Sequence, residues 1–437
     1  MAERGISISM YTHEATGAQV MLVDAPDANK VFSANFRTLP KDNTGVPHIL
    51  EHSVLCGSKR YPSKEPFVDL LKGSLKTFLN AMTAADKTMY PVASQNKQDF
   101  FNLVNVYLDA CLNPRILDPV AGPRILKQEG WNHMSDDVDA PIKYSGVVYN
   151  EMKGVYSSAD QTNAKAVRQA LYQDHPIYSI DSGGDPRAIP NLTYEAFSDF
   201  HRKYYHPSNG FFYFYGDPEE LPHTERLALL DEYLREYKVP AEVESIPWQP
   251  LLDTPYAVTA TYPADATASS APTQFVTLAW LLNSEPIDAQ TSLALSVLND
   301  LLLGSATAAL QKPLLESRLG ASVIGGGFGL SLQQARLGMP HAACRMPHAT
   351  CHATPNPNTE YEHATGLLRR RPQGRGRRHR ARGGCQRPHT GHAQGRRRGR
   401  LRGGRHRGEH ELDGVSSAID LGLPHEGPQL RLRCRLR

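Results

Sequence analysis

The sequence predicts an α+β fold in which layers of helices pack on a mixed β-sheet. Two kinds of segment follow one another along the chain: strands with alternating apolar residues, and helices with apolar residues at helical spacing. With 437 residues, of which 40% are hydrophobic and 21% charged, the chain can bury the cores of more than one domain. Strand and helix signals mixed in this way are typical of layered α+β domains.

The first expected elements are strands at residues 18–23 and 30–38, the second with Phe32 and Phe36 on one face. Asn96 can cap the helix that follows it, and Cys111 lies on the apolar stripe of that helix, as a core residue rather than a reactive thiol. Further along we expect an aromatic strand at 210–216, a proline-containing linker at 239–254, a strand at 273–282 and a helix at 292–303.

Charge is distributed unevenly, although the formal net charge is only +3. Residues 369–437 contain 20 Arg and 5 acidic residues, so the chain before them is acidic. No run of eighteen apolar residues predicts a membrane span, and the first residues match neither a secretory signal nor an organellar presequence. The six cysteines do not form a disulfide framework. We therefore expect a folded protein that is not secreted and has no membrane partner.

The region 339–437 predicts no packed domain. After Phe328 the only aromatic residue is Tyr361, so this stretch has little with which to build a core. Its Arg-, Gly- and His-rich composition favours a disordered tail or an artefact of the gene model. Binding of RNA or single strands is the alternative, although such segments usually interleave aromatic residues. Without a core to hold them, its metal-ligating residue types do not predict a zinc site: Cys344, His348, Cys351 and His352.

The sharpest chemical signal lies in residues 47–52, with the sequence PHILEH. On a helix, His48 and His52 lie one turn apart on the same face, where both imidazoles can bind one cation. Imidazoles suit Zn²⁺, and Glu51 beside them can take a proton from a water on the metal. The spacing leaves open that both histidines are hydrogen-bonded core residues. A catalytic zinc also needs a third protein ligand, which the motif does not contain.

Longer segments around this motif resemble the inverzincin peptidases of the pitrilysin family, M16. The resemblance is most specific to the members that degrade targeting presequences in mitochondria and plastids. It is carried by residues 45–58, 61–74, 77–81, 144–156, 181–187 and 200–209. Together these segments span nearly all of residues 8–217, and the similarity then weakens to about Leu332 and ends.

The resemblance implies a pitrilysin-like catalytic domain at 1–238 and, after the linker, a partial second domain of the same type at 255–338. It implies one zinc per chain, with His48 and His52 as ligands and Glu51 as the catalytic base. Glu151 matches the third ligand on a second helix, although spacing alone would not select it.

Two further residues, Asn80 and Ala81, match the family's edge strand, to which an extended peptide adds as an extra strand. A simple turn residue is the alternative interpretation of Asn80. The resemblance implies that these residues bind the substrate backbone without demanding a particular side-chain sequence.

The implied activity is that of a zinc metalloendopeptidase for short unstructured peptides, such as cleaved targeting presequences, through attack of a zinc-bound water with Glu51 as general base. The implied location is the mitochondrial matrix or the plastid, with a cytoplasmic location open because no targeting segment is visible. The resembling enzymes close two homologous halves around a peptide, so we expect a C-terminal half or another chain to complete the chamber. Two alternatives remain: a catalytically incomplete fragment or assembly subunit, and a nucleic-acid binder that acts through the Arg-rich tail.

Overall fold

The structure is a computed structural model of the whole chain, which divides into two units, residues 1–365 and 366–437. The residues that it describes are 5–63, 66–135, 137, 139–238, 240–255, 257–262, 274–317, 323–324, 327–330, 335–338 and 341–344. The second unit and most of the predicted tail, including His348, Cys351 and His352, lie outside the described residues.

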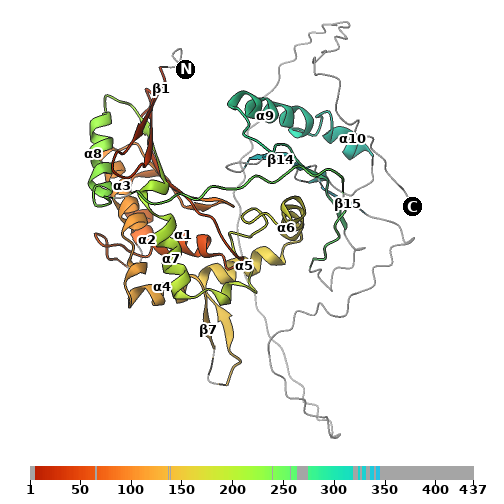
Figure 1. The fold of residues 1–437 in the computed structure, drawn as a ribbon, viewed down its shortest axis with the longest axis horizontal. Coiled ribbons are helices and arrows are strands. Elements are labelled where there is room, and N and C mark those ends of the chain that lie inside the picture. The colour runs from red at the N-terminus through yellow and green to blue at the C-terminus, as the bar shows by residue number, and fades with distance from the viewer. Residues whose placement is uncertain are drawn as a thin grey trace, which may run out of the picture. The chain divides into compact units, whose positions relative to one another are not determined.

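Residues 7–216 contribute the strands of a seven-stranded sheet of mixed direction (Figure 1). Its order is β1-β2-β9-β3-β6-β4, and β5 also pairs with β6. β2 and β9 are parallel, whereas β3 runs antiparallel to both of its neighbours. The strands are β1 (Ser7–Thr12), β2 (Gln19–Asp24), β3 (Lys30–Arg37), β4 (Lys76–Leu79), β5 (Met82–Thr83), β6 (Lys87–Ser94) and β9 (Gly210–Gly216). The three strands expected in this part of the sequence are confirmed as β2, β3 and β9.

Helices cover one face of this sheet, where α3 contacts β3 and β6, and α1 contacts β5 and β6. The helices are α1 (Val46–Val54), α2 (Pro66–Gly73), α3 (Lys97–Leu112), α4 (Ala121–Glu129), α5 (Val147–Ser157), α6 (Ala159–Tyr172), α7 (Tyr194–Tyr204) and α8 (His223–Leu234). A hairpin of β7 (Asn132–Met134) and β8 (Lys143–Ser145) joins α4 to α5. Asn96 caps α3, as expected, by accepting the N–H of Asp99 at 2.9 Å, and Cys111 is fully buried.

The core lies between the sheet and these helices. Phe32 and Phe36 of β3 are fully buried, whereas Asn35 between them is only partly buried. Phe212 and Phe214 repeat the pattern on the neighbouring β9. Burial of each of these side chains contributes about 1.5–3 kcal/mol. A one-residue slip would move all of them to the other face, so the register of the strands that position α1 is strongly specified.

The segment 240–255 forms neither helix nor strand, but part of it packs on the preceding residues. Nε2 of His175 lies 2.9 Å from the carbonyl oxygen of Pro247, and Ile246 is buried. Two three-stranded sheets follow, with the orders β10-β15-β12 and β11-β14-β13. Their strands are β10 (Gln274–Val276), β11 (Ala279–Leu281), β12 (Val323–Ile324), β13 (Gly327–Leu330), β14 (Ala335–Gly338) and β15 (His341–Cys344). The helices are α9 (Ala289–Leu303) and α10 (Gln311–Glu316).

Two features of this region differ from the sequence expectation. The strand expected at 273–282 is divided into β10 and β11, which lie in different sheets. β15 falls in the stretch for which no packing was expected. Its pairing with β10 and β12 uses backbone groups, which need no aromatic side chains, so strand pairing extends to Cys344 rather than Gly338. In the described part of the chain, no helix is long and apolar enough to cross a membrane.

Candidate metal centre and active site

α1 presents three of the predicted site residues on one side. Gly45, before the helix, has a φ of 70°, and a Cβ there would come within 2.7 Å of the carbonyl oxygen of Gly183. Glycine is therefore required at this close approach. Apolar residues at helical spacing anchor the helix in the core: Val46, Ile49, Leu50 and Val54. They leave His48, Glu51 and His52 at a pocket.

The side chains of His48, His52 and Glu151 lie close together. Oε2 of Glu151, on α5, is 3.6 Å from Nε2 of His48 and 3.8 Å from Nε2 of His52. One ligand atom from each residue lies within 4.8 Å of the others, and the described residues contain no second group of this kind. In a tetrahedral zinc site with bonds of about 2.0–2.1 Å, ligand atoms are about 3.3 Å apart. Two imidazoles with a carboxylate oxygen at 3.6 and 3.8 Å from their nitrogens suit such an ion and leave one position open.

The second ring nitrogen of each histidine also has a protein partner. Nδ1 of His48 lies 3.1 Å from the carbonyl oxygen of Gly183, and Nδ1 of His52 lies 3.5 Å from Oε2 of Glu129. Carbonyl and carboxylate partners of this kind fix the tautomer of a metal-binding histidine. Both rings therefore keep Nε2 directed toward Glu151.

Three carboxylates make the site electronegative. Burial alone would lower the pKa of His52, but its polar contact with Glu129 and the charges of Glu51, Glu129 and Glu151 together raise that pKa above its usual value. None of the described lysines or arginines forms an ion pair with these carboxylates. The site thus favours a bound cation.

Glu51 is held by one of its two oxygens. Its side chain is nearly buried, and the hydroxyl of Thr83 on β5 donates a hydrogen bond of 2.5 Å to Oε2. No group among the described residues donates to Oε1. That oxygen stays available to a water molecule in the pocket.

The pocket at this site has a volume of about 360 Å³. Its walls come from α1, the β4–β5 edge, α5 and the segment near Gly183: His48, Glu51, His52, Ala81, Met82, Thr83, Glu151 and Gly183. Asn80 lies between β4 and β5, where its N–H donates to the carbonyl oxygen of Pro91 at 3.2 Å and its own carbonyl accepts from the Tyr107 hydroxyl at 3.3 Å. Asn80 is thus both a connecting residue and part of the sheet edge; substrate binding by Asn80 and Ala81 stays a prediction.

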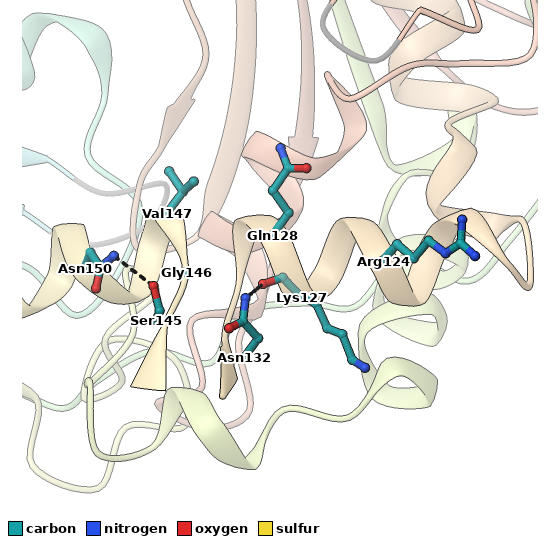
Figure 2. Close-up of a pocket in the computed structure, with 8 residues that line it drawn as sticks. All are labelled: Arg124, Lys127, Gln128, Asn132, Ser145, Gly146, Val147 and Asn150. Atoms are coloured by element: carbon teal, nitrogen blue, oxygen red, sulfur yellow. Dashed lines mark hydrogen bonds between the residues drawn. The ribbon is translucent and has the colours of Figure 1, made fainter. Parts of the chain in front are cut away.

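A larger pocket of about 480 Å³ lies between α4, the β7–β8 hairpin and the start of α5. It is lined by Arg124, Lys127, Gln128, Asn132, Ser145, Gly146, Val147 and Asn150. Figure 2 shows Arg124 and Lys127 pointing away from the hydrogen-bonded pair Asn150 and Ser145. This pocket gathers neither metal ligands nor an acid–base pair, so we assign the chemistry to the smaller one.

Three partners of the site were not expected from sequence: Thr83, Glu129 and Gly183. Thr83 is the last residue of β5, three residues after Asn80, and no motif identified it. Glu129 is the last residue of α4, and no motif surrounds it. For Gly183 a signal existed, because it lies in 181–187, one of the segments that carry the family resemblance.

Comparison with known proteins gives the family. Residues 37–123 match the family model described as insulinase (peptidase family M16), and residues 191–337 match the one described as peptidase M16 inactive domain. Over 332 residues, the chain is 48% identical to presequence protease 1, chloroplastic/mitochondrial, of Arabidopsis thaliana, covering 76% of this chain and 30% of that protein. The chain belongs to the M16 peptidase family.

Other relatives of this M16 chain are similar over comparable lengths. Protein HypA of Clostridium perfringens is 44% identical over 315 residues, covering 72% of this chain and 32% of that protein. The mitochondrial presequence protease of Danio rerio is 39% identical over 330 residues, which cover 74% of this chain and 31% of that protein. The chain therefore spans about a third of the length of these curated relatives.

Solved structures agree on the fold. Pitrilysin superposes with a TM-score of 0.52 at 19% identity, covering 78% of this chain and 34% of that chain. A structure titled as the peptidase M16 inactive domain from Pseudomonas fluorescens gives a TM-score of 0.58 at 15% identity. The superposition covers 77% of this chain and 74% of that chain. The expected pitrilysin-like α+β fold is thereby confirmed.

Proposed function

We propose that this chain is a zinc metalloendopeptidase that cleaves short unstructured peptides, such as cleaved targeting presequences. The observation that carries the proposal is the meeting of His48, His52 and Glu151 in one pocket beside Glu51. M16 peptidases are generally zinc-dependent, and several relatives of this chain are named presequence proteases. Those names also support a location in the mitochondrion or plastid.

In this mechanism His48, His52 and Glu151 would hold the zinc. When bound, the ion would polarise the scissile carbonyl and lower the pKa of a water molecule to about 7. Glu51 accepts the proton of the attacking water on Oε1 while Thr83 holds Oε2, and it then delivers that proton to the leaving amine. A peptide extended along Asn80 and Ala81 would have its scissile carbonyl beside Glu51 through backbone hydrogen bonds, with little dependence on sequence.

The proposal includes a partner that completes the chamber. M16 homologues act on peptides and often enclose them between two halves, whereas this chain spans about a third of its curated relatives. We propose that a C-terminal half, or another chain of that type, covers the pocket and excludes water from it, which strengthens the electrostatic interactions inside.

Turnover of a quenched fluorescent, unstructured peptide tests the function. Glu51→Gln should retain zinc but lose about 10²–10⁴ in rate, because the amide cannot accept the proton of water. Glu195→Gln, at an exposed carboxylate on α7, is the matched control and should cleave like wild type. Addition of a C-terminal half from a full-length relative should raise the wild-type rate. Equal rates for wild type and Glu51→Gln, with and without that half, would overturn the proposal.

A further inference from the structure

The segment 181–187 lies against the chain just before α1. The backbone N–H of Asp181 donates to Oδ1 of Asn43, and the N–H of Asp185 donates to the carbonyl oxygen of Asn43, each at 2.8 Å. The absence of a side chain at Gly45 lets Gly183 approach to a distance that any Cβ would block. Asn43 and Gly45 thus place the carbonyl of Gly183 beside the first turn of α1.

A second set of contacts ties the same segment to α5 and α6. The hydroxyl of Tyr156, on α5, donates to Oδ2 of Asp181 at 2.9 Å and accepts from Nζ of Lys165, on α6, at 2.8 Å. Lys165 also pairs with Asp185 at 2.9 Å, and Arg168 pairs with Asp181 at 3.0 Å. The side chains of Asp181 and Asp185 are only 14% and 10% exposed, respectively. Salt therefore screens these ion pairs less than it screens ion pairs on the surface.

This network joins elements that carry two different candidate ligands. Gly183 accepts from Nδ1 of His48, and Tyr156 shares α5 with Glu151. A shift of the segment relative to α5 would therefore turn the His48 ring and change its distance to Glu151. Neither Tyr156 nor Lys165 lines the pocket itself.

We propose that Tyr156 and Lys165 are positioning residues for the metal centre. They hold segment 181–187 so that the Gly183 carbonyl keeps the proton of His48 on Nδ1 and leaves Nε2 free to bind the metal. The inference rests on the metal site in the proposed function and adds to it the device that sets the tautomer and orientation of one ligand.

Zinc affinity, measured by competition with a chromophoric chelator, is the first test. Tyr156→Phe and Lys165→Met should each weaken zinc binding by about 10–100-fold, the usual effect of losing a residue that orients a ligand. Loss of a nearby positive charge would by itself strengthen cation binding, so weaker binding by Lys165→Met points to geometry. Lys165→Arg should restore affinity. Arg187→Met also removes a positive partner of Asp185, but Arg187 is 76% exposed and lies outside α5 and α6, so affinity should not change.

The second test uses the metal-free protein, because it stays decisive if wild type binds no zinc and the proposed function fails. In ¹⁵N-histidine spectra, with His48 assigned from a His48→Gln variant, wild type should show the Nδ1-protonated tautomer and Tyr156→Phe a mixture. Wild-type zinc affinity together with an unchanged His48 tautomer in Tyr156→Phe and Lys165→Met would overturn the proposal. Equal losses in Arg187→Met would overturn it as well, because they would indicate a general effect on stability.

Discussion

His48, His52 and Glu51 each have one polar atom engaged by the protein and another that faces the pocket. Gly183 and Glu129 occupy Nδ1 of the two histidines, and Thr83 occupies one oxygen of Glu51. These contacts fix the side chains before a metal ion or a substrate binds. The metal-binding atoms therefore need little rearrangement on binding. The residues that hold the reactive groups therefore determine the geometry of the site together with the reactive groups themselves.

Thr83→Val should lower kcat for peptide cleavage by about tenfold or more, with KM and zinc content nearly unchanged. The substitution keeps the shape of the side chain but removes a hydrogen bond to a charged group, worth about 1.5–3 kcal/mol. Thr83→Ser, which keeps the hydroxyl, should recover most of the rate. If Thr83→Val cleaves as fast as wild type, the hydroxyl does not orient Glu51.

At the scale of helices and strands, local sequence signals were sufficient to predict the features that form within a single element. Apolar residues at every second position, Phe32, Ala34 and Phe36, predicted β3. Asn96 predicted the start of α3. The one-turn spacing of His48 and His52 predicted their shared face on α1. These features depend on backbone period and capping, which are set within one element.

Contacts between elements could not be read from the sequence. Glu151 was expected only because of the family resemblance, since an exposed helical glutamate carries no signal of its own. The contacts of Thr83 with Glu51 and of Glu129 with His52 join residues from different elements and have no sequence period. The division of residues 273–282 into two strands was missed for the same reason, because strand pairing decides it.

The packing of α7 against the end of α3 should make stability depend on pH. His201 is buried, and its Nε2–H donates to the carbonyl oxygen of Cys111 at 2.8 Å. Its Nδ1 is also buried and has no hydrogen-bond partner among the described residues. Burial lowers the pKa of His201 from 6.5 to about 4. The unfolded chain therefore binds the proton more readily, and the stability contributed above pH 6.5 is lost as the pH falls toward 4.

Urea unfolding of wild type and His201→Gln at pH values of about 7.5 and about 5 measures this effect. Between these values wild type should lose about 2 kcal/mol more unfolding free energy than the variant, whose amide can still donate to Cys111. Other groups titrate alike in both proteins. Parallel losses of stability would show that His201 does not titrate in this way.

On the scale of the whole molecule, the predicted catalytic domain has a continuous core around its sheet, whereas the predicted second domain leaves α9 largely uncovered. α9 has no buried residue, and Leu293, Val297 and Leu301 are exposed at one-turn spacing. An apolar stripe of this kind on a helix normally packs against another element. This face is consistent with the proposed need for a further half or chain.

Deletion of residues 366–437 should leave the melting temperature and zinc content unchanged. That stretch contains 20 Arg and no aromatic residue, so it has little to add to a core. The cut is placed beyond β15, because β15 pairs with β10 and β12. A fall of several degrees in Tm would show that the deleted residues pack on the rest of the chain.

The most direct measurement of the central claim is the zinc content of purified protein by elemental analysis. Wild type should hold about one zinc per chain, and so should Glu51→Gln and the control His133→Ala, which changes an exposed histidine on β7. His52→Ala and Glu151→Ala should lose the metal, because each removes one of three ligands. Equal zinc in wild type, His52→Ala and Glu151→Ala would contradict the assignment of the site.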